Sequence, residues 1–341
     1  MPTISDVAKE ANVSVATVSR VLNNHSSVRP ETYERVHKAI EKLSFEPNMS
    51  ARNLRRNETR VILIVTPNIT NPYYAHILTG IGDRAREYGY SALIYNTAGN
   101  EAREKEALEM LKKKKADGAI LLACNVNSIW IREYADKYPI VHCSEYIPDL
   151  DIPRVSVDNY KATQDVMEYI IELGHKRIAT ISSSNNYIST HLRLKGYKDT
   201  LKKHDIEVNN DYIVLADDEY SFKSGKAAAY KLLDQKIRPT AIFCISDTIA
   251  LGAITAAKEL GLQVPKDLTV VGFDDVDDTT KFHPYITTVA QPCYELGEES
   301  FKILYDCIND TKDMNKEVIL SHKFVVRESS APFVKRYHEK V

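Results

Sequence analysis

Residues 14–23 combine small side chains with a single cation, and this combination suits contact with DNA bases. The methyl groups of Val15 or Ala16 could touch a thymine methyl, and Arg20 could donate two hydrogen bonds to one guanine. The residues of this stretch predicted to bind DNA are Ser14, Val15, Ala16, Thr17, Ser19, Arg20 and Asn23. A helical bundle that binds another protein is the alternative interpretation.

Such residues need a helix that enters the major groove, and residues 1–46 predict one. Ser5 is a candidate N-cap for a first helix, and Ser14 for a second. Pro30 suits the first position of a third helix. A short turn at residues 12–13 joins the first two helices, which is the arrangement of a helix-turn-helix. We therefore predict a DNA-binding headpiece over residues 1–46, with the second helix at the base edges.

A basic stretch follows and is predicted to be a hinge over residues 47–59. Residues 50–56 would form a helix too short to be stable without DNA. Leu54, flanked by arginines, fits a side chain wedged between base steps from the minor groove. Residues 1–60 carry a net charge of +3 and the rest of the chain −5, which favours a polyanionic partner for the N-terminal part. The predicted DNA contacts of the hinge are Ala51, Arg52, Leu54 and Arg55.

From Arg60 onward, apolar strands alternate with helical stretches. This pattern predicts parallel sheets covered on both faces, hence an α/β fold. The strands are too numerous for one compact sheet, so we predict two doubly wound lobes within residues 60–331. Lobe 1 is expected over residues 60–160 and 291–319, lobe 2 over 161–290 and 320–331, and a tail over 332–341.

Aromatic and polar residues follow several of these strands. Ligands of open α/β sheets bind beyond the carboxyl ends of the strands, so these side chains are expected to border a ligand cleft. Aromatic rings can stack on a ligand and carboxylates can bind its hydroxyl groups, which suits a small, neutral, polyhydroxylated molecule. The residues in question are Tyr73, Tyr74, Glu145, Asp158, Ser246, Asp247 and Asp274.

Five stretches together resemble the LacI/GalR family of bacterial transcription regulators over essentially the whole chain. They are "TISDVAKEANVSVATVSRVLN", "PNMSARNL", "PTAIFCISDTIALGA", "VPKDLTVVGFDD" and "TTVAQP". The resemblance implies a headpiece, a hinge helix and a two-lobed core like that of periplasmic sugar-binding proteins, with an effector between the lobes. It also implies a homodimer on near-palindromic double-stranded operator DNA. The expected function is a repressor whose operator affinity a small molecule controls.

The resemblance assigns further roles. It matches Leu54 to an intercalating hinge leucine, Arg193 and Asp274 to effector-binding residues, and Tyr220 to an aromatic that stacks on the ligand. Two stretches, "RNETRVILIVTPNITNPYY" and "CSEYIPDLDIPRVSVDN", resemble relatives that respond to nucleosides, so a nucleoside inducer is expected. The alternatives are a sugar effector or a solute-binding protein. The predicted effector-binding residues are Tyr73, Glu145, Asp158, Tyr187, Ser189, Arg193, Tyr220, Ser246 and Asp274.

Several other chemistries are disfavoured. The five cysteines form no CxxC pair, so no zinc or redox site is expected, and we expect no metal or cofactor. "GIGDRA", residues 80–85, resembles a dinucleotide motif but falls inside a helical stretch rather than after a strand, which argues against a nicotinamide-dependent enzyme. No catalytic residues are predicted. No apolar run is long enough to cross a membrane, and a cytoplasmic protein is expected.

Overall fold

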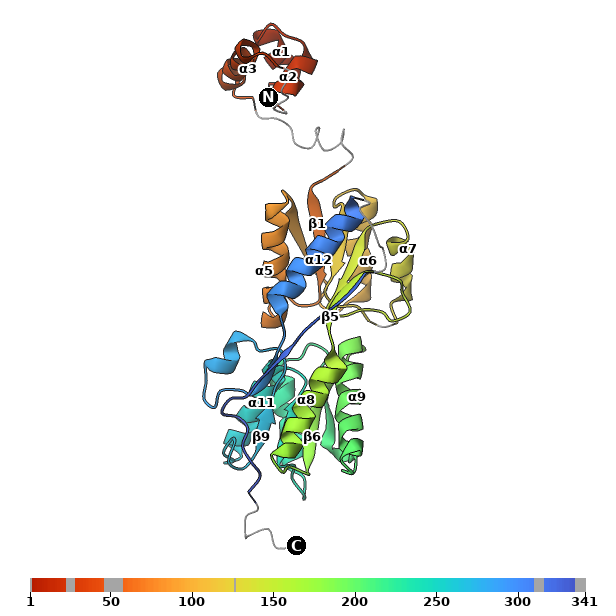
Figure 1. Cartoon of the computed structure of the whole chain (residues 1–341), viewed down its shortest axis with the longest axis vertical. Coiled ribbons are helices and arrows are strands. Elements are labelled where there is room, and N and C mark those ends of the chain that lie inside the picture. The colour runs from red at the N-terminus through yellow and green to blue at the C-terminus, as the bar shows by residue number, and fades with distance from the viewer. Residues whose placement is uncertain (1, 23–27, 46–57, 126, 310–315, 335–341) are drawn as a thin grey trace. The chain divides into compact units, whose positions relative to one another are not determined.

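The computed structural model describes residues 2–22, 28–45, 58–125, 127–309 and 316–334. The chain divides into two units, residues 1–59 and residues 60–341. Figure 1 shows the elements of both, and each unit is described by itself.

The N-terminal unit contains three short helices around a small apolar core. They are α1 (Ile4–Glu10), α2 (Val15–Leu22) and α3 (Pro30–Leu43). Thr3, not Ser5, is the N-cap of α1: its hydroxyl accepts from the Asp6 N–H, and the Asp6 carboxylate accepts from the Thr3 N–H. This reciprocal capping box satisfies two free N–H groups, which Ser5 alone could not do. The helices bury one face each, with Val7, Val18, Val21 and Val36 in the core.

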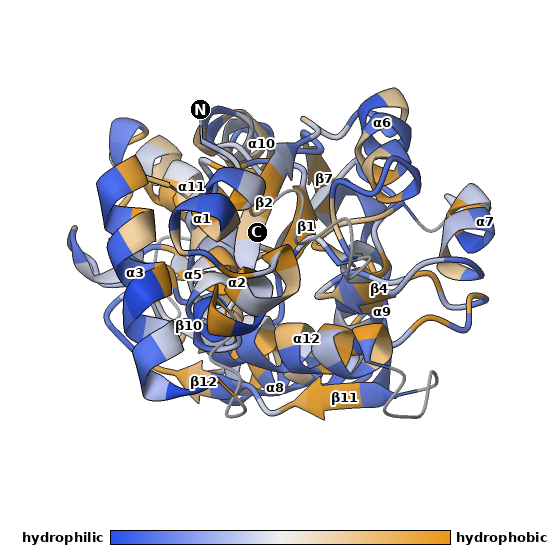
Figure 2. Cartoon of the chain, turned by 90° about the horizontal axis from the view of Figure 1, so that it is seen from above, coloured by the Kyte–Doolittle hydropathy of each residue, from blue (hydrophilic) through white to orange (hydrophobic). Residues whose placement is uncertain are grey.

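The helices of the chain are amphipathic where they cover a core. Both hydrophilic and hydrophobic residues lie around α3 (Figure 2), and its buried residues Val36 and Ala39 stand three positions apart. Residues at this spacing share one helical face. One stripe of α3 therefore packs inward while the rest meets solvent.

Lobe 1 is built on a six-stranded parallel sheet in the order β11-β5-β4-β3-β1-β2. Its strands are β1 (Val61–Thr66), β2 (Ser91–Asn96), β3 (Gly118–Leu121), β4 (Ile140–Cys143), β5 (Arg154–Val157) and β11 (Glu317–Leu320). Its helical elements are α5 (Pro72–Glu87), α6 (Glu101–Lys112), η1 (Ile129–Ile131), α7 (Arg132–Ala135) and α12 (Cys293–Ile308). Apolar residues of α5 and α12 pack on one face of the sheet, and those of α6 on the other.

Lobe 2 holds a four-stranded parallel sheet in the order β7-β6-β8-β9. Its strands are β6 (Ile178–Ser183), β7 (Ile213–Ala216), β8 (Ala241–Cys244) and β9 (Thr269–Val271). Its helical elements are α8 (Asn159–Glu172), α9 (Ile188–Lys203), η2 (Asn210–Tyr212), α10 (Phe222–Leu233), α11 (Asp247–Glu259) and η3 (Asp277–Thr280). An antiparallel pair, β10 (Thr288–Ala290) and β12 (Lys323–Val325), completes the core. The predicted α/β fold of two parallel-sheet lobes is confirmed.

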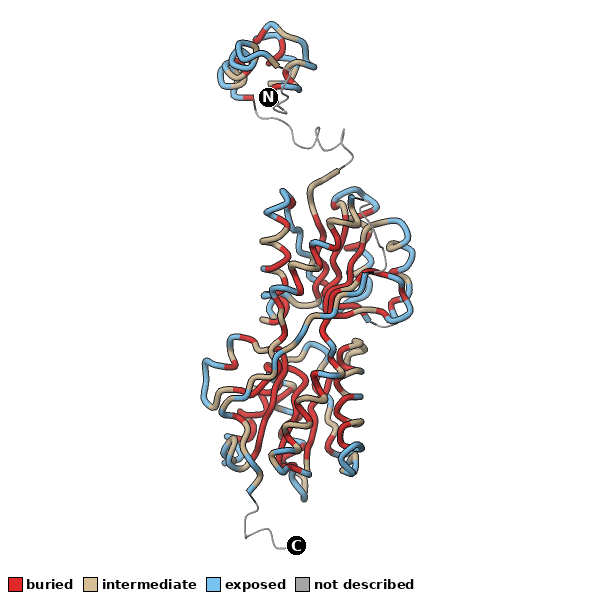
Figure 3. The backbone as a smooth tube through the Cα atoms, in the orientation of Figure 1, coloured by how far each residue is buried: buried red, intermediate tan, exposed pale blue. Residues whose placement is uncertain are grey.

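Buried strands form the centre of each lobe, and exposed residues lie on the outer faces of the helices (Figure 3). Within the described residues the two lobes share no sheet, but the chain crosses between them after β5, before α12 and after β11. Separate cores joined by crossing segments allow the lobes to change their mutual arrangement with little cost to either core.

The first glycine of "GIGDRA" serves helix packing. Gly80 lies in the middle of α5, and a Cβ built there would stand 2.1 Å from the carbonyl oxygen of Tyr294 on α12. A Cβ at Gly297 of α12 would stand 2.3 Å from the Ile77 carbonyl oxygen. The two helices therefore touch backbone to backbone, which only glycine permits. Among the described residues, no helix is long and apolar enough to span a membrane.

Candidate DNA-binding and effector sites

The outer face of α2 carries the predicted base-contacting residues. Val15 is 40% exposed, and Ser14, Ala16 and Arg20 are exposed beside it. Thr17 and Ser19 are half-buried. Ser14 also begins the helix, because its hydroxyl accepts from the Thr17 N–H at 3.1 Å. Two residues of the same helix, Val18 and Val21, are buried in the headpiece core and hold this face outward.

Some predicted DNA contacts lie outside the described residues. These are Asn23, Ala51, Arg52, Leu54 and Arg55. They remain predictions from the sequence.

A buried contact joins the two lobes of the core. Glu145 follows β4 in lobe 1, and its carboxylate accepts hydrogen bonds from the N–H of Ser189 at 3.1 Å and from the Ser189 hydroxyl. Ser189 lies in the first turn of α9 in lobe 2, where a carboxylate is favoured by the helix dipole. Burial raises the pKa of Glu145, and the two hydrogen bonds from Ser189 oppose that rise. Glu145 and Ser189 thus form an interlobe contact that depends on the arrangement of the lobes.

Two further pairs bridge the lobes. The side-chain amide of Asn186 donates to Asn125 Oδ1 at 3.3 Å. His76 Nε2 of α5 stands 3.5 Å from Asp277 Oδ1 of η3. The lobes therefore contact each other through polar side chains at several separate points.

Arg193 and Asp274 form a buried pair in lobe 2. Arg193 donates to Asn159 Oδ1 at 2.8 Å and to the Ile245 carbonyl oxygen at 2.5 Å, and its Nη1 lies 3.8 Å from Asp274 Oδ1. Gln291 donates to Asp274 Oδ1 at 2.7 Å. Burial raises the pKa of Asp274, while the positive charge of Arg193 lowers it. The guanidinium already holds three partners, so its direction is fixed before any ligand binds.

The remaining predicted residues make structural contacts. The Tyr73 hydroxyl lies 2.6 Å from Ser144 Oγ and donates to Gln291 Oε1 at 3.4 Å. Asp158 caps α8 by accepting from the Lys161 N–H at 2.9 Å. The hydroxyl of Ser246, the N-cap of α11, accepts from a backbone N–H in that helix's first turn.

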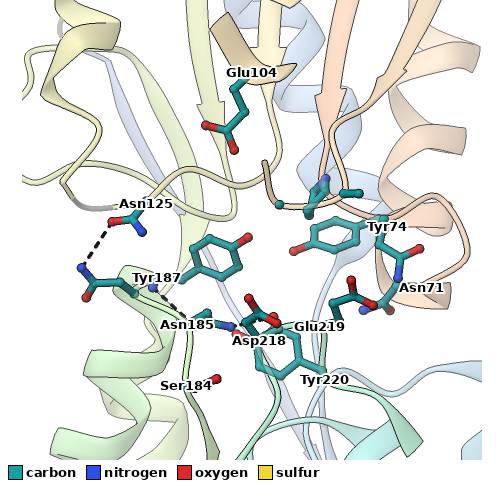
Figure 4. Close-up of a pocket in the computed structure, with 15 residues that line it drawn as sticks. Asn71, Tyr74, Glu104, Asn125, Ser184, Asn185, Tyr187, Asp218, Glu219 and Tyr220 are labelled. Atoms are coloured by element: carbon teal, nitrogen blue, oxygen red, sulfur yellow. Dashed lines mark hydrogen bonds between the residues drawn. The ribbon is translucent and has the colours of Figure 1, made fainter. Parts of the chain in front are cut away.

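A cavity of about 230 Å³ lies between the lobes (Figure 4). Ligand pockets commonly span about 300–1,000 Å³, so this one suits a small metabolite. Its lining residues are Pro67, Asn68, Asn71, Tyr74, Ala98, Gly99, Glu104, Asn125, Ser184, Asn185, Asn186, Tyr187, Asp218, Glu219 and Tyr220. Tyr187 and Tyr220 are the predicted effector-binding residues among them.

Most of the lining residues sit between the end of a strand and the start of a helix. Tyr74 lies in the first turn of α5, Tyr187 is the N-cap of α9, and Tyr220 precedes the N-cap of α10. Tyr220 has a φ of 57°, and its hydroxyl lies 2.9 Å from Thr190 Oγ1. A non-glycine residue in this left-handed region is strained by about 1–3 kcal/mol, and such strain is common at ligand sites.

Some of the lining residues that we did not predict have a usable signal in the sequence. Asn125 and Ser184 follow β3 and β6, so the strand-end rule that selected Tyr74 covers them too. Glu104 gave no such signal. It stands within a charged helical stretch, "EAREKEALEM", which reads as a solvated surface.

The described lining of the cavity includes five asparagines, three tyrosines and three acidic residues. Glu104, Asp218 and Glu219 supply carboxylates, and none of the described lining residues is a Lys or Arg. Burial, followed by the charge of Glu101, raises the pKa of Glu104 to about 7. In the described ranges, no three His, Cys, Asp or Glu side chains are grouped to hold a metal ion.

Two family models match the chain. The model for bacterial regulatory proteins of the lacI family matches residues 3–48. The model for periplasmic binding proteins and the sugar binding domain of the LacI family matches residues 59–328.

Individual proteins match nearly the whole chain. The HTH-type transcriptional repressor CytR of Escherichia coli (strain K12) is 38% identical over 329 residues, which is 96% of either chain. Catabolite control protein A of Priestia megaterium is 37% identical over 336 residues, covering 96% of this chain and 99% of that protein. Among solved structures, the lac repressor dimer bound to operator and an anti-inducer superposes with a TM-score of 0.87 at 28% identity, covering 97% of this chain and 99% of that one.

Proposed function

Because this chain belongs to the LacI family of DNA-binding transcriptional repressors, we propose that a nucleoside bound between its core lobes controls its affinity for operator DNA. The main support is the interlobe cavity, in which tyrosine rings and carboxylates face one another. Rings of this kind stack on a base, and carboxylates accept from ribose hydroxyls.

We further propose that the chain acts as a homodimer on a near-palindromic operator. The lac repressor structure is a dimer on operator DNA and matches 97% of this chain, which supports that assembly. In such a dimer the two α2 helices read two half-sites in successive major grooves. The exposed methyl groups of Val15 and the exposed Arg20 are the groups we propose for the base edges.

The effector would act through the lobe arrangement. A ligand shifts an equilibrium only by its difference in affinity for the two states. A molecule held by Tyr74 of lobe 1 and by Tyr187 and Tyr220 of lobe 2 contacts both lobes at once, so its binding depends on their distance. We propose that the change in lobe arrangement is transmitted to residues 47–59. It lowers the affinity for operator DNA, so the nucleoside acts as an inducer.

A thermal-shift series with the full chain tests the effector class. Cytidine, adenosine, uridine and inosine are compared with ribose and a hexose. A ligand at about 100 times its Kd stabilises the fold by about 2.7 kcal/mol, which is a measurable rise in Tm. A rise with nucleosides alone supports the proposal. A rise with sugars alone contradicts the nucleoside and leaves the repressor function standing.

A further inference from the structure

Glu104 differs from the other charged groups of the cavity. Its carboxylate comes from α6 of lobe 1 and points into the space above Tyr187 (Figure 4). Glu101 on the same helix pairs with Lys105 Nζ at 2.6 Å. Within the described part of the chain, the Glu104 carboxylate has no hydrogen-bond or ion-pair partner, and it is half-buried. It is therefore a desolvated acceptor that is open to a ligand.

Holding an ionised carboxylate in this half-buried position costs free energy. Moving a charged group out of water without a partner is unfavourable. Burial accordingly raises the pKa of Glu104 to about 7. Hydrogen bonds to charged groups are also about twice as strong as neutral ones. Water competes less for the half-buried Glu104 than for the exposed Asp218 and Glu219. A ligand would therefore gain more binding free energy by placing an N–H donor against Glu104.

The tyrosines fix how a base could approach this carboxylate. Tyr187 belongs to lobe 2, yet its side chain packs against the hydrophobic cluster of lobe 1. Tyr74 and Tyr220 border the same cavity from opposite lobes. A heteroaromatic ring stacked on these side chains keeps its faces on the tyrosines. Only its edge is then free to meet Glu104.

We propose that Glu104 selects the effector by the edge of its base, accepting a hydrogen bond from an exocyclic amino group. Cytidine or adenosine is then preferred over its oxo counterpart, uridine or inosine. An oxo group in the same place would set its lone pairs against those of the ionised carboxylate. The described lining has no Lys or Arg, and its side-chain donors are neutral amides and hydroxyls. This inference rests on the proposed nucleoside function of the cavity.

Isothermal titration of the full chain at pH 8, above the pKa of about 7 at which Glu104 ionises, with cytidine, uridine, adenosine and inosine tests the assignment. We expect the wild type to bind the amino member of each pair about tenfold or more tightly, as one charged hydrogen bond allows. Glu104→Gln has the same shape, but its amide both donates and accepts, so the preference should fall toward unity. Glu104→Asp keeps a carboxylate and should keep the direction of the preference.

Glu101→Gln is the matched control, because it removes the same charge from the same helix at a group already paired with Lys105. It should leave the preference intact. Equal binding of amino and oxo nucleosides by the wild type, or an unchanged preference in Glu104→Gln, overturns the role of Glu104 alone. If the wild type binds no nucleoside at all, the proposed function fails and this inference fails with it. Binding of uridine by Glu104→Gln shows that the variant is folded.

Discussion

Arg20 is an exposed cation on a helix whose other outward residues are small. If it donates to a guanine, Arg20→Ala should cost about 1–3 kcal/mol of operator affinity and relax the preference at one base pair. Fluorescence anisotropy with an operator selected from a random library, and with its single-base variants, measures both. Arg35→Ala, which removes an exposed cation from α3, is the control and should leave the base preference unchanged. A uniform loss across all sequences would make Arg20 a phosphate contact instead.

Glu104 should also make stability depend on pH. Its pKa is raised to about 7 in the folded chain, above the ordinary value of 4.5. The folded state therefore binds a proton that the unfolded state has released, and stability falls as pH rises from about 4.5 through about 7. The titratable groups described around it are Glu101, Cys124, Asp218, Glu219 and the cavity tyrosines Tyr74, Tyr187 and Tyr220. Glu104→Gln should flatten this part of the profile in Tm measurements between pH 5 and 8. Parallel profiles for the variant and the wild type would contradict a raised pKa.

At the scale of elements, the contact between α5 and α12 positions the lobe 1 side of the cavity, because Tyr74 lies in the first turn of α5. Gly80→Ala would push a methyl group into the Tyr294 carbonyl, and overpacking of this kind costs about 1–3 kcal/mol. Gly82→Ala is the matched control on the same helix. Its Cβ meets nothing within 4 Å, so it should stabilise by about 0.5–1 kcal/mol. Urea unfolding of the core distinguishes the two, and equal stability of both variants would refute the backbone contact.

The elements themselves could be predicted from the sequence, because near-continuous apolar strands and amphipathic helices leave a periodic pattern. The Thr3 cap escaped prediction, since Thr3 and Ser5 are both acceptable caps and only the reciprocal bond with Asp6 decides. Tyr74 could be selected because it follows a strand, and Tyr220 through the resemblance to the LacI/GalR family. Glu104 could not, because residues that line the cavity with it, such as Tyr187, belong to the opposite lobe and lie more than 80 positions away. Local sequence does not record such an arrangement.

At the scale of the whole molecule, the proposed control of DNA binding by an effector requires a link through the lobe arrangement. The contact between Glu145 and Ser189 is a candidate for that link, since it exists only when the two lobes lie together. Ser189→Ala removes the hydroxyl donor and leaves Glu145 buried with one hydrogen bond fewer from Ser189, which disfavours this arrangement. The variant lies in the core, so we expect effector-free binding of non-specific DNA to be unaffected.

The measurement is a thermodynamic cycle. Operator Kd is determined with and without saturating nucleoside, and nucleoside Kd with and without operator. Coupling between two sites is reciprocal, so both ratios must agree, and values of about 5- to 150-fold are typical. In Ser189→Ala both ratios should shrink by the same factor. His76→Ala, which removes a separate bridge to Asp277, provides a comparison at a second point between the lobes. Unchanged ratios in Ser189→Ala, together with a lowered Tm, would show that the contact between Glu145 and Ser189 stabilises the core without linking effector to operator.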